Sequence, residues 1–266
     1  MTVAYVGTGF HGFAAQAGVP TVGGALAEAL ATVLRQPVEL TCAGRTDLGV
    51  HAWGQVVSFD GPEGLDPAEL QRRVNKLLAP AVVVRETAIG PDGFDARRWA
   101  TGRRYRYTVV NRPVPDPFLA SFAWHVEEPL ELKSMQLGVD PLIGEHDFTS
   151  FCRRPPADRD GRVPSMTRTV REAGWTSLGD GVLRFDIEAS AFCHQMVRSV
   201  VGMLVAVGSG RRRAGEVAGI LRAKDRSLAG HLAPPHGLCL WEVTYGDGPL
   251  RSGRVLADEH TVGRTA

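Results

Sequence analysis

The 266-residue chain lacks a long apolar run. Its longest apolar stretches, such as residues 200–207, fall well short of the roughly 18 to 20 residues that a membrane-spanning helix needs. It also lacks an opening basic segment followed by a cleavable apolar one, because residues 2–6 already have the character of a strand. We therefore expect no membrane span and no export, and we predict a cytoplasmic protein.

Cysteine is scarce, and its spacing indicates no pairing. In a chain of this size, scattered cysteines are typical of free thiols in a reducing compartment. The sequence therefore predicts four unpaired thiols, at Cys42, Cys152, Cys193 and Cys239.

Net charge is nearly absent, at a formal +1, whereas nucleic-acid-binding domains are often strongly basic. Only three of the 30 basic residues are lysines, and we attribute this skew, together with abundant Ala, Gly and Val, to a GC-rich genome. Arginines do cluster, at residues 97–106, 153–154 and 211–213. Contacts to RNA phosphates would therefore depend on local charge, and a solvated surface is the default interpretation of each cluster taken alone.

The order of predicted elements indicates an α+β protein with two similar halves, residues 1–100 and 101–246, and a loosely held tail at 247–266. Two halves that each carry a sheet suggest a cleft between them. Helices are predicted at 22–34, 67–78, 130–142, 194–207 and 214–223. Strands are predicted at 2–6, 38–42, 54–59, 81–87, 104–111, 169–175, 182–189 and 238–244.

One polar loop, Gly44–His51, concentrates glycines, an arginine, a carboxylate and a histidine directly after a predicted strand. Loops of this composition often carry function. Capping of the turn by the side chains of Thr46 and Asp47 explains these residues equally well. The loop therefore needs a partner elsewhere in the chain to distinguish the two interpretations.

Arg198 is a candidate for that partner because it interrupts a predicted helix that is apolar almost all round. A guanidinium is rarely buried without a carboxylate, since desolvating it unpaired costs several kcal/mol. The alternative is an arginine whose stem lies on apolar surface and whose head reaches water. We predict that Arg198 and Asp47 lie within salt-bridge distance.

Tyr105 and Tyr107 alternate with arginines, so a strand would place both rings on one face. A pair of core tyrosines is the commoner use of such spacing, and a ring that stacks on a nucleobase is the functional alternative.

Five separated motifs together resemble the tRNA pseudouridine synthase A family. Their order and separations match this family from Tyr5 to about Thr244. The motifs are Ala43–Asp47 with Gly49–His51, Arg103–Tyr107, Asp147–Phe151, Thr167–Thr169 and Ala191–Arg198.

The resemblance implies the pseudouridine synthase fold, with two α+β halves whose mostly antiparallel sheets join across a central active-site cleft. It also implies a homodimer that acts on tRNA without metal or cofactor, at uridines 38, 39 and 40 of the anticodon stem-loop. By the same resemblance Asp47 is the catalytic aspartate, Tyr105 stacks on the base, Arg198 is the active-site arginine and Arg45 helps to hold the flipped nucleotide. Attack of Asp47 on C1′, attack on C6, and removal of a ribose proton all remain open.

The chain departs from the family mainly near its N-terminus, where Val6 replaces the usual aspartate and Leu48 replaces the usual alanine after the catalytic residue. These changes concern RNA positioning and the choice of target uridine more than the chemistry.

Three alternative functions match parts of the sequence. Residues 7–12 match a dinucleotide-binding glycine pattern, but Gly18 and Pro20 intervene before the next helix. A non-catalytic RNA-binding module suits two α+β halves with exposed aromatics. The third function is metal binding, although these four residues lack the spacing of a zinc site: Cys193, His194, His236 and Cys239.

Overall fold

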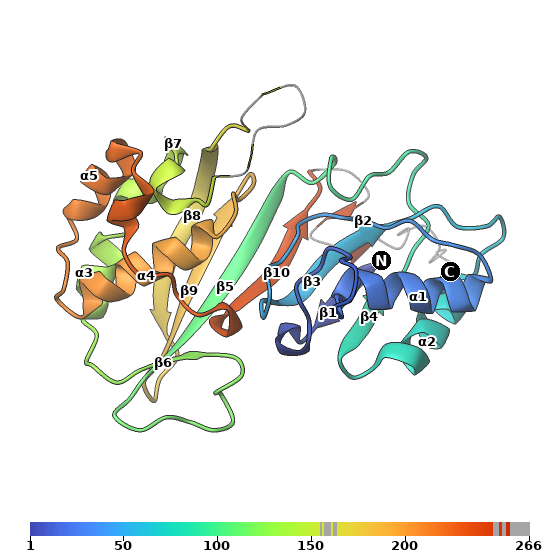
Figure 1. Ribbon diagram of the computed structural model, residues 1–266, viewed down its shortest axis with the longest axis horizontal. Coiled ribbons are helices and arrows are strands. Elements are labelled where there is room, and N and C mark those ends of the chain that lie inside the picture. Colours follow the sequence, from blue (N-terminus) through green and yellow to red (C-terminus); the bar gives the residue numbers. More distant parts are fainter. Residues whose placement is uncertain (155, 157–160, 162–163, 247–249, 252–253, 256–266) are drawn as a thin grey trace, which may run out of the picture.

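The computed structural model describes residues 1–154, 156, 161, 164–246, 250–251 and 254–255 (Figure 1). Its α-helices are α1 (Val22–Leu34), α2 (Pro67–Leu78), α3 (Leu132–Leu137), α4 (Met196–Gly208) and α5 (Glu216–Ala223). Its main strands are β1 (Thr2–Tyr5), β2 (Thr41–Cys42), β3 (His51–Ser58), β4 (Val82–Glu86), β5 (Gly102–Asn111), β6 (Trp124–Val126), β7 (Gly144–Asp147), β8 (Thr167–Ser177), β9 (Val182–Ala189) and β10 (Leu238–Thr244).

Local capping explains where the first two helices begin. The Thr21 side chain accepts a hydrogen bond from the backbone of Gly24 ahead of α1, and the Asp66 side chain accepts one from Ala68 ahead of α2. Both helices have the predicted bounds. The helix predicted at 130–142 is shorter, because α3 ends at Leu137 and a separate 3-10 turn at Asp140–Leu142 carries Pro141.

The two predicted sheets form one continuous sheet in the order β4-β1-β3-β10-β5-β9-β8-β7. Most neighbours are antiparallel, as predicted, but β10 pairs in parallel with β3. β10 also pairs antiparallel with β5, so a strand near the end of the described chain joins the two halves. The boundary between residues 100 and 101 stays a prediction.

One face of the sheet is covered and the other is open. Burial alternates along β9, where every second residue is buried, as expected for a sheet with one packed face. Figure 1 shows α1 and α2 near one end of the sheet and α3, α4 and α5 near the other. We call the partly exposed face the outer face; its side chains include those of Arg104, Arg106, Arg184 and Asp186.

In the described part of the chain, no helix has the length and apolar character needed to cross a membrane. Most of the tail predicted at 247–266 lies outside the described residues, apart from a short antiparallel pair, β11 (Leu250–Arg251) and β12 (Arg254–Val255).

Candidate active site

The polar loop predicted to carry the carboxylate runs from β2 to β3 and is anchored by buried polar side chains. The hydroxyls of Tyr5 and Thr46 share a hydrogen bond of 2.8 Å. Gln55, fully buried, donates to the backbone oxygen of Gly44 at 2.5 Å and accepts from its backbone nitrogen at 3.3 Å. Buried polar groups satisfied in this way hold a loop in one conformation. The Asp47 side chain remains partly exposed, in the wall of a cavity.

The end of the loop is fixed by the buried His51. Its Nδ1 accepts a hydrogen bond from the backbone of Gly7, and its Nε2 donates to the carbonyls of Ser121 and His236, each at 3.0 Å. Burial is the main cause that lowers the pKa of His51. A neutral histidine with these partners orients the loop and has no free nitrogen for the substrate.

The cavity beside Asp47 has a volume of about 1050 Å³ and is lined from both halves of the chain. The first half contributes residues 41–47, and the second contributes Tyr105, the start of β8 and residues 191–198. Its arginines are Arg45, Arg97, Arg103, Arg168 and Arg198, and Asp47 is the acidic residue of its described lining. This composition suits a polyanionic ligand that presents a reacting group to one carboxylate.

The predicted ion pair between Asp47 and Arg198 is wrong. The carboxylate of Asp47 instead lies 3.3 Å from Nε2 of His194, a residue that we considered only as a metal ligand. The Nε of Arg198 donates instead to the carbonyl of Ala233 at 2.7 Å. The chain around residues 231–233 passes close to α4. No pattern in the sequence predicts that these two segments lie together.

Arg198 nevertheless shares the cavity with Asp47. Burial lowers the pKa of the Arg198 guanidinium, and the charge of Asp47 opposes that shift. No hydrogen bond of its terminal Nη atoms is found among the described residues, whereas its Nε is occupied. The guanidinium is therefore held at one corner and has its outer edge free for an anion.

The two tyrosines of β5 have different environments. Tyr107 is fully buried and its hydroxyl donates to the carbonyl of Pro234 at 2.8 Å, as a core tyrosine does. Tyr105 lines the cavity, and its ring meets Phe192 edge to face with centroids 5.0 Å apart. Burial, and then the charge of Asp47, raises the pKa of Tyr105, so its hydroxyl stays protonated. Tyr105 is therefore the tyrosine available to a ligand.

Arg45 is exposed at the cavity and makes no ion pair within the described ranges. Arg103, which we grouped with possible phosphate contacts, is a structural residue instead. Its guanidinium donates to four carbonyls, those of Ala43, Arg97, Ala100 and Ser190. It thereby ties the start of the Asp47 loop to the second half of the chain.

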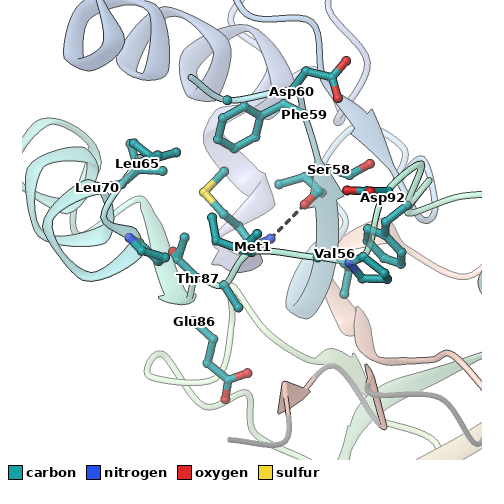
Figure 2. Close-up of a pocket in the computed structure, with 18 of the residues that line it drawn as sticks. Met1, Val56, Ser58, Phe59, Asp60, Leu65, Leu70, Glu86, Thr87 and Asp92 are labelled. Atoms are coloured by element: carbon teal, nitrogen blue, oxygen red, sulfur yellow. Dashed lines mark hydrogen bonds between the residues drawn. The ribbon is translucent and has the colours of Figure 1, made fainter. Parts of the chain in front are cut away.

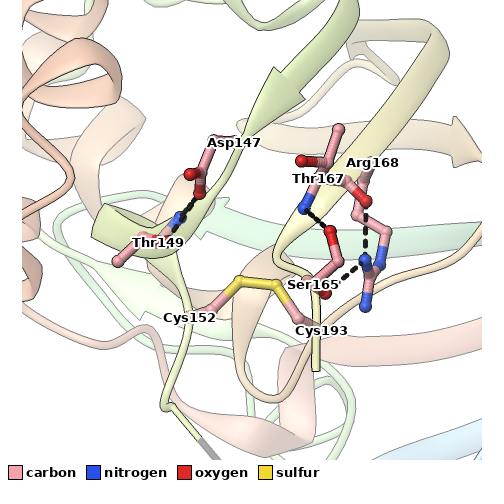
Figure 3. The surroundings of a disulfide bond; sticks show 7 residues. All are labelled: Asp147, Thr149, Cys152, Ser165, Thr167, Arg168 and Cys193. Carbon is pink, nitrogen blue, oxygen red and sulfur yellow. Dashed lines mark hydrogen bonds between the residues drawn. A yellow bond between two sulfur atoms is a disulfide. The ribbon is translucent and has the colours of Figure 1, made fainter. Parts of the chain in front are cut away.

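The expectation of four free thiols is wrong for one pair, because Cys152 and Cys193 form a disulfide with Cα atoms 5.8 Å apart (Figure 3). The backbone nitrogen of Arg153 also donates to the carbonyl of His194 at 2.9 Å. These links fix the segment ahead of α4 that carries His194. The two cysteines are 41 residues apart, so their spacing in the sequence does not indicate a pair. They come together because β7 pairs with β8 and β8 pairs with β9.

A second cavity, of about 650 Å³, lies at the start of β1 and the end of β3 (Figure 2). Met1 lies in it, and burial lowers the pKa of its amine to about 6. The charged side chains of its described lining are all acidic: Asp60, Glu63, Glu86 and Asp92. Such a cavity repels phosphates, so the first cavity is the candidate active site.

The alternative sites have no matching geometry. Residues 7–9 form a short 3-10 turn after β1, and α1 begins only at Val22, whereas a dinucleotide-binding loop opens a helix at once. No cluster of three or more metal-ligating side chains occurs among the described residues.

The chain is similar in sequence to a family of known proteins. A sequence profile described as tRNA pseudouridine synthase matches residues 139–246. A tRNA pseudouridine synthase A of Myxococcus xanthus is 38% identical over 249 residues, covering 94% of this chain and 92% of that protein. The protein of the same name from Frankia casuarinae is 42% identical over 258 residues, covering 96% of this chain and 91% of that protein.

A chain of a solved Cbf5-Nop10-Gar1 complex is similar to this chain at a TM-score of 0.33 and 15% identity. The match covers 78% of this chain and 45% of that chain. The two relatives match almost from end to end, and their alignments span both the loop of Asp47 and the helix of Arg198. The chain belongs to the tRNA pseudouridine synthase A family.

Proposed function

We propose that this protein isomerises uridine to pseudouridine in tRNA, with Asp47 as its catalytic carboxylate and without a metal or cofactor. One observation carries the proposal: Asp47, Tyr105 and Arg198 line a single arginine-rich cavity, although they come from three separate parts of the chain. Membership of the family supplies the reaction.

The reaction breaks the C1′–N1 glycosidic bond, rotates the base and forms a C1′–C5 bond. C5 then loses its proton, and N1 ends with a proton in place of the broken bond. The detached base must not escape, so the nucleotide leaves its stack and enters an enclosed pocket. In the proposal, Tyr105 holds the base by stacking and its hydroxyl assists the proton transfer at C5. Arg198 presents its free edge to Asp47 or to the nucleotide, and Arg45 holds the extruded nucleotide.

The target in the proposal is the anticodon stem-loop, at uridines 38, 39 and 40. The enzyme works as a cytoplasmic homodimer. The family resemblance supports these finer assignments, and light scattering after gel filtration tests the dimer.

Incubation with unmodified tRNA transcripts, followed by carbodiimide mapping of pseudouridine, tests the activity and the position together. We expect modification at one or more of positions 38 to 40. Pseudouridine elsewhere in the tRNA would correct the target but keep the reaction. Tight tRNA binding without any pseudouridine would instead favour the non-catalytic RNA-binding module.

A further inference from the structure

The arginines of the active-site cavity have no acidic partners of their own. Within the described residues, none of the five arginines in its wall forms an ion pair, and Asp47 pairs with His194. Desolvating a cation without a counter-charge is costly, so an anion that enters the cavity would stabilise those arginines that still lack partners. Which arginine meets which anion depends on the partners that each already has.

Arg168 is the member whose buried nitrogen is left unsatisfied. It lies at the start of β8, where one terminal nitrogen, Nη1, donates to the carbonyls of Ser165 at 2.9 Å and Thr167 at 2.6 Å (Figure 3). Its Nε is buried and has no hydrogen-bond partner among the described residues. Burial lowers the pKa of this guanidinium. Arg103, by contrast, has both terminal nitrogens occupied by carbonyls.

The dimensions of the cavity indicate what the missing partner is. Its volume of about 1050 Å³ lies just above the roughly 300 to 1,000 Å³ range of pockets that hold one small ligand. A flipped nucleotide does not fill such a space, so neighbouring parts of the RNA strand enter with it. Their phosphates present oxygens that a guanidinium binds, and the terminal Nη2 of Arg168 makes no hydrogen bond within the described residues.

We propose that Arg168 binds a backbone phosphate of the substrate RNA next to the target nucleotide. The inference rests on the proposed function, because it takes RNA as the ligand of this cavity. Arg168 lines the cavity from the second half of the protein and the loop of Asp47 lines it from the first, so the strand would be held by the second half while its nucleotide reaches the carboxylate.

The test compares Arg168→Gln with Arg72→Gln by measuring the affinity for an anticodon stem-loop RNA over a range of salt concentrations. Arg72 is an exposed residue of α2 that pairs with Glu69, and its substitution changes the net charge by the same amount away from the cavity. Each phosphate contact contributes roughly 0.7 to 0.9 to the slope of log K against log salt. We expect Arg168→Gln to lower that slope by about this amount and to weaken binding about tenfold, whereas Arg72→Gln leaves both nearly unchanged.

Two further measurements exclude a merely structural effect. Arg168→Lys keeps the charge and should retain the salt slope; a slope as low as that of Arg168→Gln would overturn the proposal. A second measurement uses a set of RNAs, each with one neutral methylphosphonate linkage at a different position. At one position the neutral linkage should weaken binding to the wild-type protein but cause no further loss of affinity in Arg168→Gln. Additive losses at every position would also overturn it.

These results are independent of turnover. If the protein formed no pseudouridine but Arg168→Gln still lowered the salt slope, the proposed reaction would fail and the phosphate site would stand. If calorimetry showed that Arg168→Gln loses binding of inorganic phosphate while its RNA salt slope is unchanged, the site would serve free phosphate and the assignment to RNA would be wrong.

Discussion

The protein has two sets of arginines that sit in opposite electrostatic environments. On the outer face of the sheet, arginines are matched by acids: Arg104 contacts Glu172 and Glu188, and Arg106 contacts Asp186. In the candidate active-site cavity, none of the five arginines forms an ion pair among the described residues, and the one carboxylate of the described lining, Asp47, lies against His194. Both sets include residues of β5, so the same strand contributes to a neutralised surface and to a cationic one.

The difference shows why net charge is a poor guide here. The formal charge of +1 is a sum over the whole chain, and in that sum the acids of the outer face offset the arginines that they pair with. A ligand responds to the local potential, and in a cavity with low-dielectric walls a few unpaired cations are enough to attract a polyanion. Substitutions in the cavity and on the outer face should therefore differ in their effect on function.

The largest effect is expected from Asp47→Asn, which removes the carboxylate of the cavity. Pseudouridine formation should fall by about 10³-fold or more, because an amide supplies neither a nucleophile nor a base. Affinity for tRNA should stay within about tenfold, since phosphate contacts dominate it and the cavity loses only a negative charge. Single-turnover assays and filter binding measure the two quantities. Residual turnover above a few per cent would remove Asp47 from the catalytic role.

Arg198→Lys should reduce single-turnover activity by roughly 10²-fold, because it keeps the charge but loses the planar fork. The Nε contact with Ala233 is lost as well, so thermal unfolding must be followed in parallel. We expect the melting temperature to fall by only a few degrees. If activity were retained, a point charge would be sufficient at this position and the proposed role of the fork would be wrong.

Tyr105→Phe should lower the rate by roughly tenfold to a hundredfold with little change in RNA affinity, since stacking remains and the hydroxyl is lost. Tyr107→Phe is the control on the same strand. It removes a core hydrogen bond to Pro234 and should cost about 1 kcal/mol of stability while activity stays near that of the wild type. An exchange of severity between the two variants would mean that the wrong tyrosine has been assigned.

The smallest effect on function is expected on the outer face, from Arg106→Gln. The guanidinium of Arg106 packs 3.6 Å above the ring of Trp241 and pairs with Asp186, so its loss should cost about 1 kcal/mol of stability. Activity should remain within about twofold and the salt slope of tRNA binding should not change. A lowered salt slope would show that the outer face also contacts RNA, and the contrast between the two faces would fail.

Several features of the fold could be predicted because their causes are local. The helices α1 and α2 have the predicted bounds, since Thr21 and Asp66 cap them and helical periodicity follows. Alternation along β5 correctly separated Tyr105 and Tyr107 from Arg104 and Arg106. The strand β7 was missed because it has four residues, three of them polar, and forms only by pairing with β8.

The family, the α+β class and the residues that could do chemistry could all be inferred from sequence patterns, because motifs, capping residues and periodicity act over a few positions. Which of these residues meet depends on the folded chain. It brought His194 rather than Arg198 against Asp47, joined Cys152 to Cys193 and inserted β10 between β3 and β5. Each of these contacts joins segments tens to hundreds of residues apart. These long-range contacts form because the whole sheet must bury its apolar face, and no local propensity encodes that requirement.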